Sequence, residues 1–586
     1  MPTTMPGHVR AASLNELEVR GQLTVTVGGR TLALFRHQGR VHAIDNRCPH
    51  MGFPLDRGSL CDGILTCHWH HARFDLSSGG SFDLWADDVP AYPVEVRDGA
   101  IWVDLTPPAD ARTRQRDRLE VGLEQEIPLI VAKAVLSLME ENHTAGEPFR
   151  AGLAFGTRYR DAGWGQGLTM LTCFTNLTPL LDADDRPRAL YQGLSAVARD
   201  TAGRPPRFPV RPLPGATPDA ATLKRWFRQF IEVRDGDGAE RCIVSALRVG
   251  MSPATVADML FAAVTDHRYI NVGHPLDFTN KALEALDATG WEDADLVLTS
   301  LVRGYAMADR MEESNAWRHP IDLVAILEQA FDRLPALWQE DHAAADATVN
   351  APPLAPLNSP LLDTLLGDNP QTIVDALLAA LEQGRAAEEI AQAVAYAAAL
   401  RIARFHTSNE FGDWDTALHT FTFANAVHQG LRRAPSPELL RGVFDAAMSV
   451  YLDRFLNMPA ARLPELQPGG TPDALLADLA ALLDRQQQVN AAAQVAVNYL
   501  ATGADPQRLF ATVGRLLLRE DRDFHTIQAV EAAFRQVGLA EDATQRAHFL
   551  VAAIRYLAAH APTVRSQGQT YQIALRLHRG EALFEG

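Results

Sequence analysis

Apolar residues follow two different patterns along the chain. In the first hundred residues, Gly28-Gly29, Gln38-Gly39 and Asp98-Gly99 separate short β-rich runs, which lie at 23–27, 31–35, 40–45, 92–96 and 100–105. Short runs joined by such turns are typical of antiparallel strands. From about residue 120 onward, segments rich in Ala, Leu and Val repeat their apolar positions with a period near 3.6, which indicates helices. We therefore expect a multidomain protein, with a small antiparallel-β domain followed by a large all-α domain.

The boundary between the two parts is expected near residue 106. Pro107-Pro108 and the charged residues 109–118 predict a linker over 107–119, which leaves 1–106 for the β domain and 120–586 for the helical domain. Proline and glycine residues punctuate the expected helices, which include 127–141, 253–265, 275–288, 386–405, 420–431, 437–455, 472–499, 506–519 and 544–559.

Length and charge narrow the classes of protein. A chain of 586 residues exceeds what one hydrophobic core supports, and a net charge of −18 argues against nucleic-acid or anionic-membrane partners. The sequence has no apolar run of membrane-spanning length and no export signal at its start. Its five cysteines include three that are scattered singly, a usage that suits a reducing cytoplasm.

A motif of cysteines and histidines carries the first chemical signal. Cys48-Pro-His50 and Cys67-His-Trp-His70 are separated by sixteen residues. Two such half-sites supply two thiolates to one iron and two imidazoles to the other, which is the ligand set of a Rieske [2Fe-2S] centre. Zinc also binds Cys2His2 sets, but zinc sites favour paired cysteines, whereas each half-site here mixes one Cys with one His. We therefore predict a [2Fe-2S] cluster on Cys48, His50, Cys67 and His70, with His68 and His71 outside the ligand set.

Histidines of the helical domain carry a second signal. The pattern His-x3-Phe-x-Asn occurs at His274 and again at His419, at the expected start of a helix, and fainter copies surround His525 and His143. Repeated helix pairs of this kind can bring several histidines to one interior point, where they would bind a metal. The alternative is that these histidines cap helices or form hydrogen bonds in the core. His267 and His406, which precede the repeats, are either further ligands or residues that orient the ligands.

The helical part resembles the questin oxidase family, which includes fungal enzymes that open the central ring of anthraquinones. The resemblance rests on the stretches that begin at His274 and His419 and on the scattered histidines at helix starts. It implies an iron that is held by several histidines and, in some members, by a carboxylated lysine; the matching positions are His143, His274, His419, His525 and Lys281. The fused cluster domain departs from the fungal pattern. The Asn/Asp-x2-His-x4-His iron motif of ordinary Rieske oxygenases is absent, so the likeness to that family is confined to residues 1–106.

Lys281 is an unusual residue for this chain. Of its 54 basic residues only Lys133, Lys224 and Lys281 are lysines. A desolvated lysine can lose its proton and add CO2 to form a metal-binding carbamate, which arginine cannot do. Lys281 lies two helical turns after His274 on the same face, so it is a candidate catalytic and metal-ligating residue. The alternative is a lysine that reaches the surface or pairs with Asp277.

These observations favour a Rieske-coupled non-haem iron oxygenase. In this hypothesis the cluster passes electrons to a mononuclear Fe(II), which activates O2 against an aromatic or polycyclic, quinone-like substrate. A separate reductase or ferredoxin would supply the electrons, because no dinucleotide-binding fingerprint is present, and a homo-oligomer is compatible with the sequence. The competing hypothesis is a Rieske electron-transfer or redox-sensing protein whose helical array binds partners. A two-metal carboxylate site would need paired Glu-x-x-His motifs, and the expected helices lack them.

Overall fold

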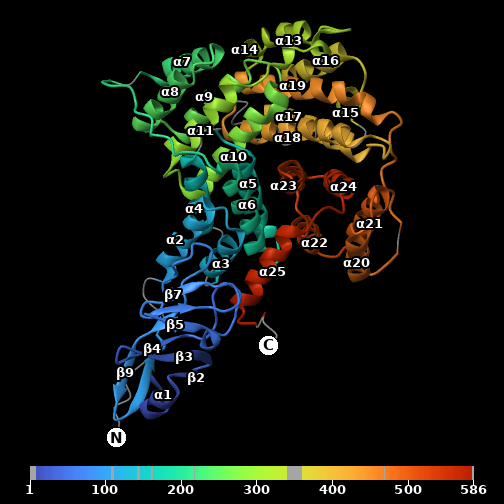
Figure 1. Cartoon of the computed structure of the whole chain (residues 1–586). Coiled ribbons are helices and arrows are strands. Elements are labelled where there is room, and N and C mark those ends of the chain that lie inside the picture. The colour runs from blue at the N-terminus through green and yellow to red at the C-terminus, as the bar shows by residue number, and fades with distance from the viewer. Residues whose placement is uncertain are drawn as a thin grey trace. The chain divides into compact units, whose positions relative to one another are not determined.

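The computed structural model describes residues 8–106, 111–140, 146–159, 163–216, 218–338, 359–467, 469–581 and 583. The chain forms two compact units, one made of Met1–Ala151 with Ser566–Gly586 and the other of Gly152–Arg565. The first unit contains a small antiparallel-β domain and the second is helical, which confirms the predicted fold class (Figure 1). None of the helices in the described part of the chain combines the length and the apolar character that a bilayer crossing requires.

Three antiparallel sheets build the β domain, with strand orders β2-β3-β4-β8, β1-β10-β9 and β5-β6-β7. The strands are β1 His8–Ser13, β2 Gln22–Val27, β3 Arg30–His37, β4 Arg40–Asp45, β5 Ser59–Cys61, β6 Ile64–Thr66, β7 Arg73–Asp75, β8 Ala91–Tyr92, β9 Val94–Arg97 and β10 Ala100–Asp104. The middle of strand β3 is buried on both faces. Successive side chains of a strand point to opposite sides, so its buried residues enter two different cores. Leu32 and Leu34 enter one core, and Ala33 and Phe35 enter a second core that also contains Cys48 and Cys67.

Helix α2 (Ala111–Glu124) occupies most of the segment for which a linker was expected. Leu119 and Leu123 are its buried apolar residues, and Gly122 lies closely against Ile130 of α3 (Pro128–Met139). Packing against α3 therefore orders a charged segment that would not be stable as an isolated helix. The first unit thus continues beyond the expected boundary, through α2 and α3, and also includes the C-terminal helix α25 (Ser566–His578), which packs on α3.

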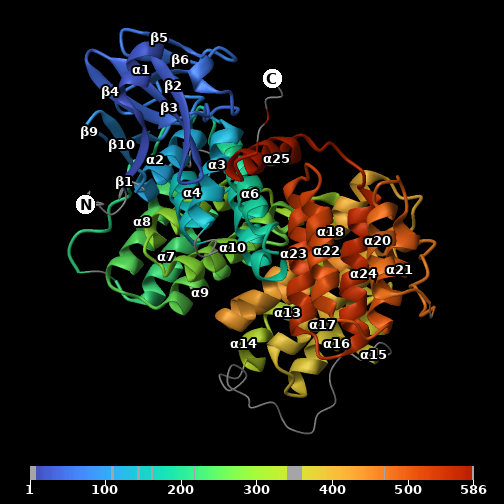
Figure 2. The same ribbon diagram turned by 90° about the horizontal axis from the view of Figure 1, so that it is seen from below.

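The centre of the second unit is α18 (Phe411–Arg433), which packs against both α17 (Ala387–Ala403) and α19 (Pro437–Leu452) (Figure 1). Its other contacts include α10 (His274–Thr289) and α23 (Phe524–Leu539), and all three helices are labelled in Figure 2. These contacts bring together segments that are far apart in the sequence.

Two predicted helix boundaries in the second unit are wrong. Helix α18 begins at Phe411, because Glu410 and Asp413 form a capping box, so His419 lies in the third turn and not at a helix start. The segment 472–499 forms two helices, α20 (Pro472–Leu482) and α21 (Val489–Ala501). Gln487 between them adopts a left-handed conformation with φ of 58°, which a continuous helix does not allow.

Candidate metal centres

Two loops of the β domain carry the predicted cluster ligands. Cys48 and His50 follow β4, and Cys67 and His70 follow β6. Each loop is a tight turn closed by backbone hydrogen bonds: the Cys48 amide donates to the Phe53 carbonyl at 2.8 Å, and the Cys67 amide donates to the Ala72 carbonyl at 2.8 Å. These bonds hold the two half-sites in matching conformations.

The four side chains meet as a cluster would require. Both thiols are buried, at 2% and 1% exposure, and the rings of His50 and His70 lie 4.8 Å apart and nearly perpendicular. A hydrogen bond from Cys48 lowers the pKa of Cys67 to about 6, which favours a thiolate. His50 Nδ1 is buried and has no hydrogen-bond partner in the described structure, so this nitrogen is available to bind iron. The residues therefore fit a [2Fe-2S] cluster. His68 and His71 are exposed.

Three of the predicted histidines of the helical unit converge. His274 on α10, His419 on α18 and His525 on α23 place one ligand nitrogen each within 4.8 Å of the others. The closest approach is 3.1 Å between the Nε2 atoms of His274 and His419. The ring of His525 lies 4.7 Å from that of His419 and 5.6 Å from that of His274. Three imidazoles at these distances can bind one transition-metal ion.

Hydrogen bonding and burial leave His419 and His525 with nitrogens that could bind a metal ion. The Nδ1 of His419 lies 2.6 Å from the carbonyl oxygen of Asp415, so this nitrogen carries the proton and Nε2 presents a lone pair. Burial and the neighbouring imidazoles of His274 and His525 lower the pKa of His419 to about 3, which keeps the ring neutral. His525 Nε2 is buried without a hydrogen-bond partner among the described residues. Neutral imidazoles with free lone pairs are the form that binds metal.

A strained segment positions His274. Tyr269, Asn271 and Val272 have φ values of 40°, 43° and 48°, a conformation that costs about 1–3 kcal/mol for each residue. Gly273 follows with φ of 89°, and any Cβ there would come within 2.8 Å of Phe423 on α18. The strained backbone at 269–272 therefore allows α10 to begin at His274, directly against α18.

Asp277 is a functional candidate beside the three histidines that could not be recognised from the sequence. It lies one turn after His274 and is 1% exposed, and neither of its carboxylate oxygens has a hydrogen-bond partner in the described structure. Its Oδ2 lies 4.0 Å from His274 Nδ1. A buried carboxylate without a donor is costly unless a cation is near. No sequence pattern marks such a residue, because the cost comes from tertiary burial.

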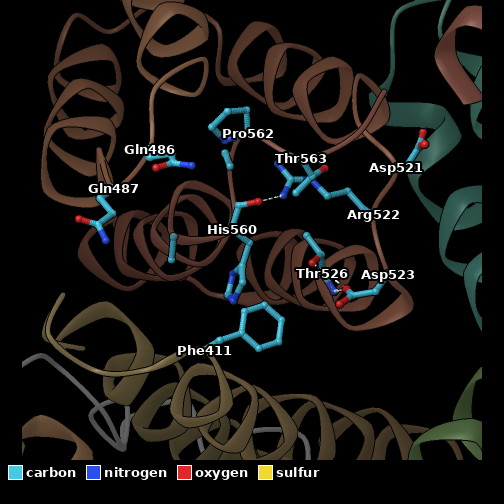
Figure 3. A pocket seen from close by; sticks show the side chains of 12 residues that line it. Phe411, Gln486, Gln487, Asp521, Arg522, Asp523, Thr526, His560, Pro562 and Thr563 are labelled. Atoms are coloured by element: carbon cyan, nitrogen blue, oxygen red, sulfur yellow. Dashed lines mark hydrogen bonds between the residues drawn. The ribbon is translucent and has the colours of Figure 1, made fainter. Parts of the chain in front are cut away.

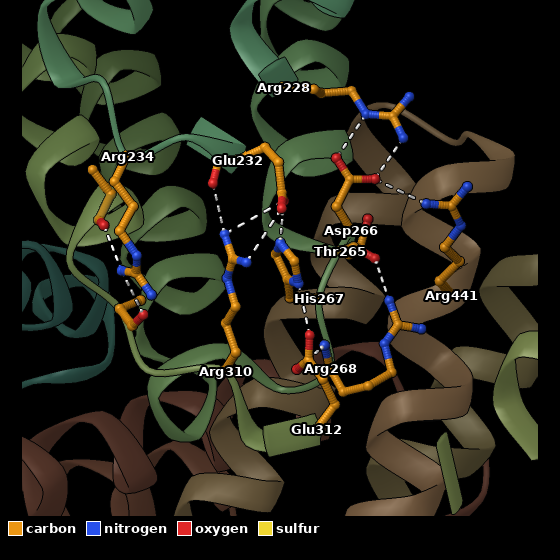
Figure 4. A network of polar contacts seen from close by, with 12 residues as sticks. Arg228, Glu232, Arg234, Thr265, Asp266, His267, Arg268, Arg310, Glu312 and Arg441 are labelled. Carbon is orange, nitrogen blue, oxygen red and sulfur yellow. Dashed lines mark hydrogen bonds and ion pairs between the residues drawn. The ribbon is translucent and has the colours of Figure 1, made fainter. Parts of the chain in front are cut away.

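The remaining predicted histidines differ from the three that converge. His143 lies outside the described residues. His267 lies between Glu312 (2.6 Å) and Glu232 (2.7 Å) in a network of ion pairs (Figure 4). His406 Nδ1 contacts the Ser408 hydroxyl at 2.7 Å. His267 and His406 therefore have protein partners of their own and are not in the group that converges.

Lys281 forms a buried ion-pair cluster. It is 1% exposed, and its Nζ lies 2.5 Å from Glu531 and 3.0 Å from Glu284. Burial alone would lower the pKa of Lys281, but these two carboxylates raise it above its ordinary value. The charged amine cannot add CO2, so this arrangement disfavours the carbamate that the resemblance implies. The alternative partner, Asp277, is also not the residue that Lys281 contacts.

A pocket of about 560 Å³ reaches the first turn of α23, a volume within the range of small-molecule sites. Asp523 and Thr526 line it and flank His525 along the chain. The rings of His560 and Phe411 form another part of the lining and lie 4.6 Å apart, edge to face (Figure 3). The pocket therefore combines aromatic and polar groups near one of the three converging histidines.

Comparisons with known proteins concern the β domain. Residues 8–93 match the family of Rieske [2Fe-2S] domains. The ferredoxin component of the naphthalene 1,2-dioxygenase system of Pseudomonas aeruginosa is 30% identical over 99 residues, which cover 17% of this chain and 95% of the relative. The ferredoxin component of the alkene monooxygenase system of Xanthobacter autotrophicus is 32% identical over 82 residues, which cover 14% of this chain and 67% of the relative.

The β domain is also similar to a solved structure. The ferredoxin of carbazole 1,9a-dioxygenase from Nocardioides aromaticivorans is 30% identical, with 17% of this chain and 98% of that chain covered and a TM-score of 0.16. The family match over residues 8–93 and the 30% identity to the Pseudomonas ferredoxin component show that these residues form a Rieske [2Fe-2S] domain, and through this domain the chain belongs to the Rieske [2Fe-2S] family.

Proposed function

We propose that the chain is a Rieske-coupled non-haem iron oxygenase that acts on an aromatic or polycyclic, quinone-like substrate. An iron ion held by His274, His419 and His525 would supply O2 activation, with electrons delivered through the [2Fe-2S] cluster. A separate reductase or ferredoxin would reduce the cluster.

The convergence of the three histidines carries this proposal. They come from three helices that are far apart in the sequence, and they are brought together in a chain that also contains an electron-transfer domain. A group of core histidines with a structural role would be expected to satisfy its nitrogens with protein partners. Here His525 Nε2 and the nearby Asp277 carboxylate are buried without such partners among the described residues.

Each neighbouring residue has a specific task in this proposal. The Asp415 carbonyl fixes the tautomer of His419. After a small movement of either side chain, His274 Nδ1–H would donate a hydrogen bond to the Asp277 carboxylate. The Phe411 and His560 rings would contact an aromatic substrate in the pocket. The resemblance to questin oxidases supports a quinone-like substrate.

The competing function is a Rieske electron carrier with a helical partner-binding scaffold. One observation favours it, because the relatives matched over most of their length are ferredoxin components. The two functions differ in what happens to electrons after they reach the cluster.

Single-turnover reoxidation tests the proposal. Full-length protein reduced with dithionite is mixed with O2, and the Rieske absorption is followed in the wild type, in His419→Ala and in the control His406→Ala. The oxygenase predicts fast reoxidation in the wild type and in His406→Ala, and the slow rate of an isolated cluster in His419→Ala. Equal rates in all three proteins would support the carrier.

A further inference from the structure

A lysine from outside the matched Rieske segment holds the first cluster loop. Lys133 lies on α3, and its ammonium donates hydrogen bonds to the carbonyl oxygens of Pro49 and His50, the latter at 3.4 Å. The same ammonium pairs with Asp87 at 2.9 Å. Lys133 therefore contacts the loop that presents two of the four cluster ligands.

The charges around this contact do not cancel. Asp87 also pairs with Arg118 of α2 at 3.1 Å, and Arg118 donates to the Ala86 carbonyl at 2.9 Å. Two cations share one carboxylate, so the group formed by Lys133, Asp87 and Arg118 carries one net positive charge. The side chains are only 13%, 20% and 17% exposed, which limits screening by solvent.

A second helix holds the same loop. Arg47, which directly precedes Cys48, donates to the carbonyl oxygen of Leu577 on α25 at 2.6 Å. Helices α3 and α25 both lie outside residues 8–93, so the cluster loop of this chain has contacts that the matched segment does not include.

From these contacts we propose that Lys133 is a positioning residue that sets the reduction potential of the [2Fe-2S] cluster. Reduction adds one electron to the cluster, and a fixed positive charge beside the His50 loop stabilises the reduced form more than the oxidised form. The negative charge of Asp87 destabilises the reduced form and so limits the increase in the reduction potential. The proposal depends on the first unit alone and holds whether or not the second, helical unit binds iron.

The test is a redox titration of full-length protein monitored by the electron paramagnetic resonance signal of the reduced cluster. Lys133→Met is expected to shift the ratio of oxidised to reduced cluster about tenfold toward the oxidised form at a given potential, which lowers the midpoint by about 59 mV for a one-electron couple. Lys133→Arg retains the charge and is expected to remain within about threefold of the wild type. Asp87→Asn is expected to raise the midpoint.

Lys224→Met is the matched control, because Lys224 pairs with Asp258 and Glu438 in the other unit. Its midpoint should equal that of the wild type. A Lys133→Met midpoint equal to that of the control overturns the proposal. Shifts of Lys133→Met and Asp87→Asn in the same direction also overturn it, because they indicate a loosened loop and not an effect of charge. If Lys133→Met does not assemble the cluster, Asp87→Asn becomes the deciding variant. A midpoint of Asp87→Asn that is equal to or below that of the wild type then overturns the proposal.

Discussion

The Nε2 atoms of His274 and His419 lie 3.1 Å apart, although 145 residues separate the two histidines in the sequence. The Nε2 of His419 presents a lone pair, because its Nδ1 is bound to a carbonyl oxygen. A contact at this distance therefore requires a shared proton or a cation between the rings. In the metal-free protein a proton on His274 can occupy this position, and a metal ion would replace it.

His419→Ala is predicted to remove one metal ion while leaving the cluster intact. The expected iron content falls from about three to about two per chain, because the cluster holds two irons on separate ligands. Elemental analysis gives the iron content, and the Rieske spectrum reports the cluster. His406→Ala, with a histidine that contacts Ser408, should keep all of the iron. Unchanged iron in His419→Ala would show that this histidine is structural.

Asp277→Asn is predicted to weaken metal binding about 10- to 100-fold, because it removes the carboxylate beside His274. Competition with a chelator measures the affinity. Asp287→Asn is the matched control, since Asp287 lies on the same helix but is exposed and pairs with Arg433. If the two variants bind metal equally well, Asp277 has no role at the site.

Lys281→Ala is predicted to destabilise the helical unit by about 3 kcal/mol, because two buried carboxylates, Glu284 and Glu531, would then share Arg535 as their one cationic partner among the described residues. Chemical denaturation measures this loss. Lys281→Arg should restore much of the stability and retain the iron, because it keeps the positive charge. A carbamate ligand predicts a different result, in which both variants lose iron and a short carboxylic acid restores it to Lys281→Ala.

His267 is predicted to make the stability of the helical unit depend on pH. Burial alone would lower the pKa of His267, but Glu312 and Glu232 raise it above the ordinary value. Folding therefore favours the protonated ring. This stabilisation is complete below the unfolded-state pKa of about 6.5 and is lost as the pH rises through the higher folded-state pKa.

Thermal unfolding across this pH range checks the prediction. His267→Gln should lose the part of the pH dependence that arises from this network, so its unfolding temperature should fall less steeply with rising pH than that of the wild type. Equal slopes in the two proteins would contradict the assigned role.

The cluster site was predictable because its chemistry is local. Cys48 to His70 form one short segment, and the spacing of ligands within it defines the site. The repeat around His274 and His419 also identified two of the converging histidines. Neither the strained start of α10 nor the unpaired carboxylate of Asp277 could be predicted, because both depend on packing against other helices. The same reason explains α2, where two buried leucines and contact with α3 determine the structure of a charged segment.

An anomalous-scattering map measured at the iron absorption edge would locate the iron ions of both metal centres in one experiment. We predict two adjacent iron peaks between Cys48, Cys67, His50 and His70, and one separate peak within bonding distance of the nitrogens of His274, His419 and His525. A map with the two cluster irons and no peak among these three histidines, from crystals grown with iron, would contradict it.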